Sequence, residues 1–150
     1  MAAGMAAAAS ASGVMGLVTR EEAHSLVAEI FRETAVLYLN SVLSEAFPGV
    51  PETSGSLGKL VHLLNQLSPS DFDRAIVFPL FLMGCMSEDP GWREGVKQRL
   101  RFLDDTFGDI ARILKQMDDI YEERMTRQHG SHPVQWQEYL RSHWAVSLLL

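Results

Sequence analysis

The sequence predicts an all-α protein, a compact multi-helix bundle around one central apolar helix that contains a proline. Apolar residues recur every three or four positions along most of the chain, whereas no stretch of useful length alternates with the two-residue period of a β-strand. Residues 75–86 are all apolar, Gly or Pro, which is typical of a helix buried on every side. A length of 150 residues suits one domain, which we place at residues 19–150.

Residues 1–18 are predicted to form a flexible leader rich in Ala, Gly and Ser. Ala9, Ser10 and Ala11 have the small side chains of a signal-peptide cleavage site, but the charged and Leu-rich regions of a secretory signal are missing. The run 75–86 is too short for the ~20 residues that a membrane-spanning helix needs. We therefore expect an intracellular protein.

The first helix is predicted to begin at Thr19, because Thr19 and Glu22 have the spacing of a capping box. An apolar stripe with a 3.6-residue period follows it. The stripe, which is expected to face the core, contains Ala23, Leu26, Val27, Ile30, Phe31, Thr34, Ala35, Tyr38, Leu39, Val42 and Leu43. Residues 48–51, with two prolines and a glycine, are expected to end the helix, and residues 52–56 to form a loop.

Two further helices are predicted before residue 87. A short one covers residues 57–67, and Ser70 is expected to cap the next, which contains the apolar run 75–86. Pro79 lies inside that run and removes a backbone donor, so a kink is expected there. Phe78 is expected to lie deep in the core, where Phe78→Ala would cost about 3–5 kcal/mol.

The fourth helix is predicted over residues 92–106, and the fifth after Gly108 with Asp109 as its cap. The residues expected to face the core are Trp92, Val96, Leu100, Leu103, Phe107, Ile110, Ile113, Leu114, Met117, Ile120 and Tyr121. Those expected to face water are Arg93, Glu94, Lys97, Gln98, Arg101, Asp104, Asp105, Asp118, Asp119, Glu122, Glu123 and Arg124. One more short helix is predicted around Trp136, before an apolar tail at 144–150 that either packs on the body or forms a contact surface.

The net charge of the chain argues against direct binding of nucleic acid. The net charge is −6, whereas phosphate contacts need clustered Lys and Arg. The basic residues Lys97, Arg99 and Arg101, with Arg93 nearby, are interpreted as a solvated helix face. We therefore expect no direct binding of nucleic acid by this chain.

The sequence contains no recognisable pattern of catalytic or metal-binding residues, so no catalytic residue, metal or cofactor is assigned. The motifs G-x-S-x-G, G-x-G-x-x-G and Walker A are absent. The carboxylate pairs Asp104–Asp105 and Asp118–Asp119 are adjacent on helices, so their side chains point about 100° apart. The single cysteine, Cys85, is interpreted as inert packing. The five histidines, interpreted as surface or loop residues rather than zinc ligands, are His24, His62, His129, His132 and His143.

A set of methionine and aromatic residues is the candidate for an effector or partner pocket, because such side chains adapt to irregular shapes. The set consists of Phe78, Met83, Met86, Trp92, Met117 and Trp136. Ordinary core packing is the alternative interpretation of these residues, and the sequence favours it.

The stretch 78–86, with the sequence FPLFLMGCM, is followed by Glu88-Asp89 and a basic amphipathic helix at 93–103. This order resembles the regulatory domain of fungal-specific transcription factors, the zinc binuclear-cluster activators. Tyr121 and Trp136 stand where that pattern has its later aromatic positions. The resemblance covers about residues 57–150 and implies a helical regulatory scaffold.

The resemblance does not extend to DNA binding, since the DNA-binding unit of that family is a six-cysteine zinc cluster and this sequence has one cysteine. It implies a role in transcription regulation in the nucleus, by partner contact, masking of activation or effector sensing. The partners implied are proteins of the transcription machinery or a related transcription factor, with no membrane. A small-molecule-binding helical protein of a metabolic pathway is the alternative.

Overall fold

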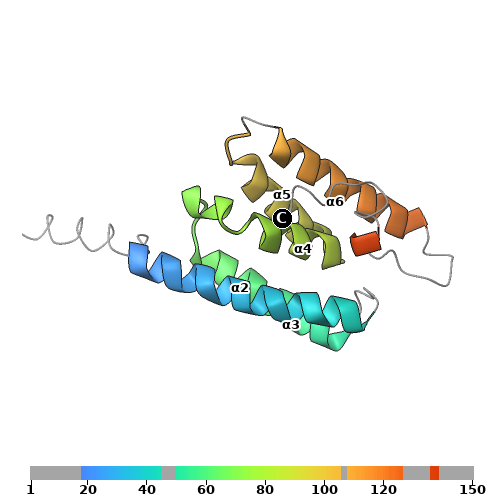
Figure 1. Cartoon of the computed structure of the whole chain (residues 1–150), viewed down its shortest axis with the longest axis horizontal. Coiled ribbons are helices and arrows are strands. Elements are labelled where there is room, and N and C mark those ends of the chain that lie inside the picture. Colours follow the sequence, from blue (N-terminus) through green and yellow to red (C-terminus); the bar gives the residue numbers. More distant parts are fainter. Residues whose placement is uncertain (1–17, 45–49, 106–107, 127–135, 139–150) are drawn as a thin grey trace, which may run out of the picture.

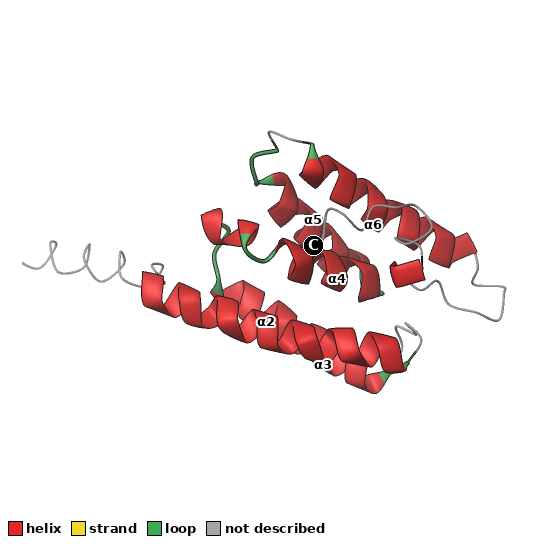
Figure 2. Cartoon of the chain, viewed as in Figure 1, coloured by secondary structure: helices red, strands yellow, loops and turns green. Residues whose placement is uncertain are grey.

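A computed structural model of the protein describes residues 18–44, 50–105, 108–126 and 136–138. The elements in these ranges are α2 (Arg20–Leu43), α3 (Pro51–Gln66), the 3₁₀-helix η1 (Asp71–Arg74), α4 (Val77–Met86), α5 (Pro90–Arg101) and α6 (Asp109–Thr126). All of them are helical (Figure 2), and the all-α class predicted from the sequence is confirmed. The leader up to residue 17 and the apolar tail at 144–150 lie outside the described residues.

The helices form two groups with α4 between them. α2 and α3 run side by side, and α5 and α6 lie on the other side of α4 (Figure 1). α4 packs against α2, α3, α5 and α6, and all of its residues from Pro79 to Met86 are buried. The sequence-based prediction of a central apolar helix is therefore confirmed for residues 77–86, whereas Ala75 at the start of the run is exposed.

α2 begins as its sequence predicts. The hydroxyl of Thr19 accepts a hydrogen bond from the Glu22 backbone N–H at 3.2 Å, and the Glu22 carboxylate accepts one from the Thr19 N–H at 2.8 Å. This reciprocal capping box satisfies two of the backbone donors that a helix start leaves open. The buried residues of α2 lie on one face of the helix. This face includes Thr34 and Ser41, whose hydroxyls donate to carbonyls of their own helix.

The outer half of the predicted α2 stripe does not face the core, which is a correction. Ala23, Ile30 and Thr34 are buried as expected, and Leu37 joins them. The members that face solvent instead are Phe31, Ala35, Tyr38, Leu39, Val42 and Leu43. A helix that is apolar on two sides has no periodicity that tells which side is inward.

α3 starts six residues earlier than the sequence predicted, at Pro51 rather than Leu57. The predicted loop over 52–56 is therefore wrong. Proline at the first helical position has no intrahelical bond to lose, and its fixed φ suits a helix start, so Pro51 begins α3 instead of merely ending α2. Thr53 and Ser56 in this added segment are buried.

The predicted third helix is divided into two elements. Ser70 does act as a cap, but for η1, where its hydroxyl accepts from the Phe72 N–H at 3.2 Å. The chain then turns at Ala75–Ile76, and α4 begins at Val77. Pro79 is consequently the third residue of α4, in the first turn, where its missing N–H breaks no helical bond. The chain therefore changes direction at the turn between η1 and α4, and not at Pro79 as the sequence predicted.

α5 and α6 are shifted relative to their predicted bounds. α5 starts at Pro90 and ends at Arg101, because the Asp89 carboxylate caps it at the Gly91 and Trp92 N–H groups. At α6 the predicted cap, Asp109, is already inside the helix. The Asp105 carboxylate supplies the cap instead, accepting from Ile110 and Ala111 at 2.9 and 3.0 Å. Gly108 permits this turn with a φ of 74°.

None of the described helices combines the length and the apolar composition that crossing a bilayer requires.

Candidate functional site

The structure distributes the six candidate pocket residues over three places. Met83 and Trp92 line one groove, Phe78 and Trp136 meet in an aromatic cluster, and Met86 and Met117 are fully buried core residues. Trp92 was expected to face the core, but it is 38% exposed.

A groove lies between α3, α4 and α5 and has a volume of about 220 Å³. Its walls are mostly apolar. The lining residues are Val61, Leu64 and Asn65 of α3, Met83 of α4, and Gly91, Trp92, Gly95, Val96 and Arg99 of α5. We refer to these nine residues as the α3–α5 groove.

One end of the α3–α5 groove is fixed by Arg99. Its Nε and Nη2 donate to the two carboxylate oxygens of Asp73 at 3.0 and 2.7 Å, and its Nη1 donates to the Leu64 carbonyl at 2.9 Å. Asp73 is 1% exposed. This two-point pair joins η1, α5 and the end of α3, which holds the walls of the groove together.

The aromatic cluster joins the helical turn at 136–138 to α2 and α4. The Trp136 ring is 4% exposed, and its centroid lies 5.9 Å from that of Tyr38, 6.3 Å from Phe78 and 6.1 Å from Phe81. The rings of Tyr38 and Phe81 meet Trp136 edge-to-face, which is a preferred arrangement for packed aromatics, and the Phe78 ring is tilted against it. Phe81 is fully buried, whereas Phe78 is only partly buried.

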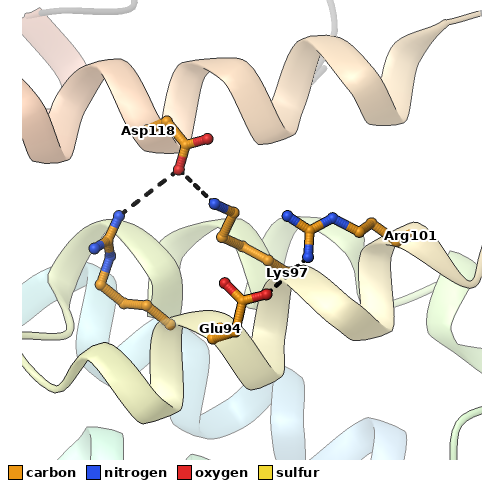
Figure 3. Close-up of polar contacts among 5 residues, drawn as sticks. Glu94, Lys97, Arg101 and Asp118 are labelled. Atoms are coloured by element: carbon orange, nitrogen blue, oxygen red, sulfur yellow. Dashed lines mark hydrogen bonds and ion pairs between the residues drawn. The ribbon is translucent and has the colours of Figure 1, made fainter.

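The interpretation of the basic cluster on α5 as a solvated face holds for Arg101, whose side chain is 49% exposed, but it is wrong for Arg93, Lys97 and Arg99. The Arg93 guanidinium lies 3.3 Å from the Tyr121 ring centroid, and Arg93 is buried. Figure 3 shows Asp118 of α6 directed at Lys97 of α5, with an Nζ–Oδ1 distance of 2.6 Å. Asp118 also lies 4.0 Å from Arg93. Arg93 and Lys97 thus connect α5 to α6, with their aliphatic stems covered and their charged ends bonded to the neighbouring helix.

The carboxylates of Asp118 and Asp119 diverge, as expected. Asp118 turns to α5, while Asp119 accepts from Lys115 on its own helix at 2.6 Å. Asp105 caps α6, as described above. The prediction that Asp118 faces away from the protein body is wrong, because it bonds to Lys97 on the neighbouring helix.

Cys85 is 1% exposed, and burial raises the pKa of its thiol to about 12. Such a thiol stays protonated and unreactive at neutral pH.

The carbonyl of Cys85 accepts a hydrogen bond from the Arg124 guanidinium, and burial lowers the pKa of Arg124. The predicted outward position of Arg124 is therefore wrong. Arg124 places a cation at the carbonyl end of α4, where the helix dipole favours it.

No three His, Cys, Asp or Glu side chains of residues 18–44, 50–105, 108–126 and 136–138 are placed to share a metal ion. His24 packs edge-to-face on Phe72, with centroids 5.2 Å apart, and His62 is exposed on α3. His129, His132 and His143 lie outside the described residues.

The outer face of α2 is an exposed apolar surface, and all of its large members except Val36 were predicted from the sequence to face the core. Its large members are Phe31, Val36, Tyr38, Leu39, Val42 and Leu43, of which Leu39 is 58% and Leu43 82% exposed. Residues 34–44 contain no charged side chain. Contiguous exposed apolar surface of this kind marks sites of protein or ligand contact.

Comparisons with known proteins agree with the resemblance found in the sequence. The family profile described as "Fungal specific transcription factor domain" matches residues 8–149. The chain is 24% identical over 136 residues to the trichothecene biosynthesis transcription regulator TRI10 of Fusarium sporotrichioides, which covers 89% of this chain and 32% of that protein. The chain thus spans about a third of the length of this curated relative. No solved structure matches the chain. The family match extends over nearly the whole sequence, and the chain belongs to the fungal specific transcription factor domain family.

Proposed function

We propose that this chain is a regulatory domain that acts in transcription, in the nucleus, through contacts with protein partners. Membership of a transcription factor domain family supports this proposal, as does the similarity to a transcription regulator. The observation that carries the partner contact is the exposed apolar outer face of α2.

The outer face of α2 has the geometry that packs against another α-helix. Phe31, Ala35, Tyr38 and Val42 follow one another at spacings of four, three and four residues, and all are exposed. This is the spacing of a helix–helix seam, and the absence of charge over 34–44 removes any desolvation cost of burying ions there. The partner proposed is an amphipathic helix of the transcription machinery or of a related transcription factor.

The chain is proposed to act without binding DNA directly and without catalysing a reaction. A net charge of −6 opposes contact with phosphates, and a single buried cysteine cannot build a six-cysteine zinc cluster. Two arginines of α5 are engaged inside the protein, Arg93 on the Tyr121 ring and Arg99 with the Asp73 carboxylate.

A second candidate function, a small-molecule-binding protein of a metabolic pathway, is favoured by the α3–α5 groove. The two functions separate on one point. The first requires the surface of α2, and the second requires only the groove.

Transcript profiling tests the proposal. Deletion of the gene is expected to change a defined set of transcripts, and wild-type protein is expected to restore them. An Ala35→Glu/Val42→Glu variant places charges on the exposed seam of α2 without entering the core, and it is expected to restore none. Met125→Glu on α6, at a residue that is also exposed, is the matched control and is expected to restore all. Full rescue by the α2 variant would reject the proposed partner surface, and an unchanged transcript set would reject the role in transcription.

A further inference from the structure

We propose that the α3–α5 groove is a binding site for a compact, neutral aromatic molecule. This goes beyond the proposed function, because it stands whether or not the outer face of α2 binds a protein. An apolar cavity of about 150 Å³ is known to hold benzene. The α3–α5 groove, at about 220 Å³, therefore has room for a fused pair of aromatic rings.

Gly95 keeps this groove open at a cost to the helix. It lies in the interior of α5, where glycine is less stable than alanine by about 0.5–1 kcal/mol. A Cβ at position 95 would meet no atom within 4 Å, so packing does not require a glycine there. The missing side chain instead contributes the space that Trp92 and Met83 border.

The side chains that border the space are suited to an aromatic ring. Trp92 is 38% exposed although it stands in an apolar groove, and its indole offers a flat surface for stacking. Met83 is also a lining residue and has a polarizable thioether, and sulfur–aromatic contacts are favourable.

The charges around the groove specify a neutral ligand. Arg99 is the single ionisable residue among its lining residues, and its guanidinium already donates to Asp73 and to the Leu64 carbonyl. Because the guanidinium is occupied, only the aliphatic part of the Arg99 side chain is left to contact a ligand. Asn65 contributes an exposed amide that can donate to, or accept from, one hydroxyl group of the ligand.

A titration with 2-naphthol tests the site, because this probe has two fused rings, one hydroxyl group and no charge at neutral pH. The readout is the carbon-13 methyl resonance of Met83, assigned with a Met83→Leu variant. A saturable shift is expected. The 2-naphthoate anion is expected to bind at least tenfold more weakly, since the one cation among the lining residues, Arg99, already donates to Asp73 and to the Leu64 carbonyl.

Variants at two glycines decide whether the groove is the site. Gly95→Leu fills the space and is expected to weaken 2-naphthol binding at least tenfold with unchanged helix content. Gly55→Leu is the matched control: Gly55 is also in a helix interior with nothing within 4 Å of an added Cβ, but it does not line the groove, so binding should be unchanged. A shift that stays linear up to the solubility limit, or equal affinity in the Gly95→Leu protein, would overturn the inference.

Discussion

Met117 of α6 occupies the space that a side chain on Gly84 of α4 would fill. A Cβ built on Gly84 would lie 1.9 Å from the Met117 Cε and 3.3 Å from its Sδ. Both residues are buried, and α4 and α6 contact each other. The glycine therefore allows a methionine to lie directly against the backbone of the central helix.

Gly84→Ala is expected to destabilise the protein by about 1–3 kcal/mol, because the added methyl group overpacks the core. The end of the Met117 side chain is flexible and can move away from the new methyl group. The expected loss of stability is therefore smaller than it would be if the methyl group met backbone atoms. The change in the free energy of unfolding can be measured by urea denaturation followed by circular dichroism.

A double variant checks that Met117 is the cause. Met117→Ala is expected to cost about 2–5 kcal/mol by leaving a cavity. In Gly84→Ala/Met117→Ala the new methyl group refills part of that cavity, so the double variant should cost less than the sum of the two single variants. Strict additivity would contradict the proposed contact.

The ion pair of Asp73 with Arg99 provides a second prediction. Asp73→Ala leaves the Arg99 guanidinium without its partner in a mostly buried position, where side-chain exposure is 12%. The expected loss is about 3 kcal/mol, the lower end of the usual range for removing one partner of a buried pair. Asp71→Ala, two residues away and exposed, should change stability by less than about 0.5 kcal/mol. Equal effects of the two substitutions in urea denaturation would show that the pair contributes little.

The sequence predicted those features that depend on local or strongly periodic signals. The capping box of Thr19 and Glu22 uses residues three apart, and the apolar run of α4 has no polar face to place outward. Both predictions were confirmed because they need no knowledge of distant residues.

Features that depend on partners far along the chain were not predictable in this way. Arg93 was expected in water, but its place is decided by Tyr121, 28 positions later, which only the fold brings within 3.3 Å. The groove likewise combines Met83 with residues of α3 and α5. A charged residue with a long aliphatic stem carries no sequence signal that distinguishes a stacked, buried position from an exposed one.

Two phenylalanines of α4 are expected to differ in their contribution to stability. Phe81 is fully buried against Trp136, so Phe81→Ala is expected to cost about 3–5 kcal/mol. Phe78 is partly buried, so the value expected from the sequence for Phe78→Ala is too high, and about 1–3 kcal/mol is expected instead. Equilibrium unfolding of the two variants under identical conditions gives the comparison. A larger loss for Phe78→Ala than for Phe81→Ala would contradict the described packing.

The single cysteine is expected to be inert in the folded protein. Cys85 is buried and protonated at neutral pH, whereas thiol reagents need an exposed thiolate. At pH 8, reaction with Ellman's reagent should therefore proceed no faster than unfolding, and it should be complete at once in concentrated guanidinium chloride. Rapid, complete labelling of the native protein would show that the thiol is accessible.

The raised pKa of Cys85 also predicts how stability depends on alkaline pH. Its pKa is about 12 in the folded protein, compared with an ordinary value of 9.0. Between these values the unfolded chain has lost the thiol proton while the folded protein still holds it, so the unfolded state binds fewer protons and the free energy of unfolding falls as pH rises. Below the ordinary pKa the thiol is protonated in both states and contributes no pH dependence. Urea denaturation of wild type and Cys85→Ala between pH 8 and pH 10.5 measures the difference, with the steeper decline expected for wild type. Parallel pH profiles for the two proteins would show that the thiol ionises equally in both states.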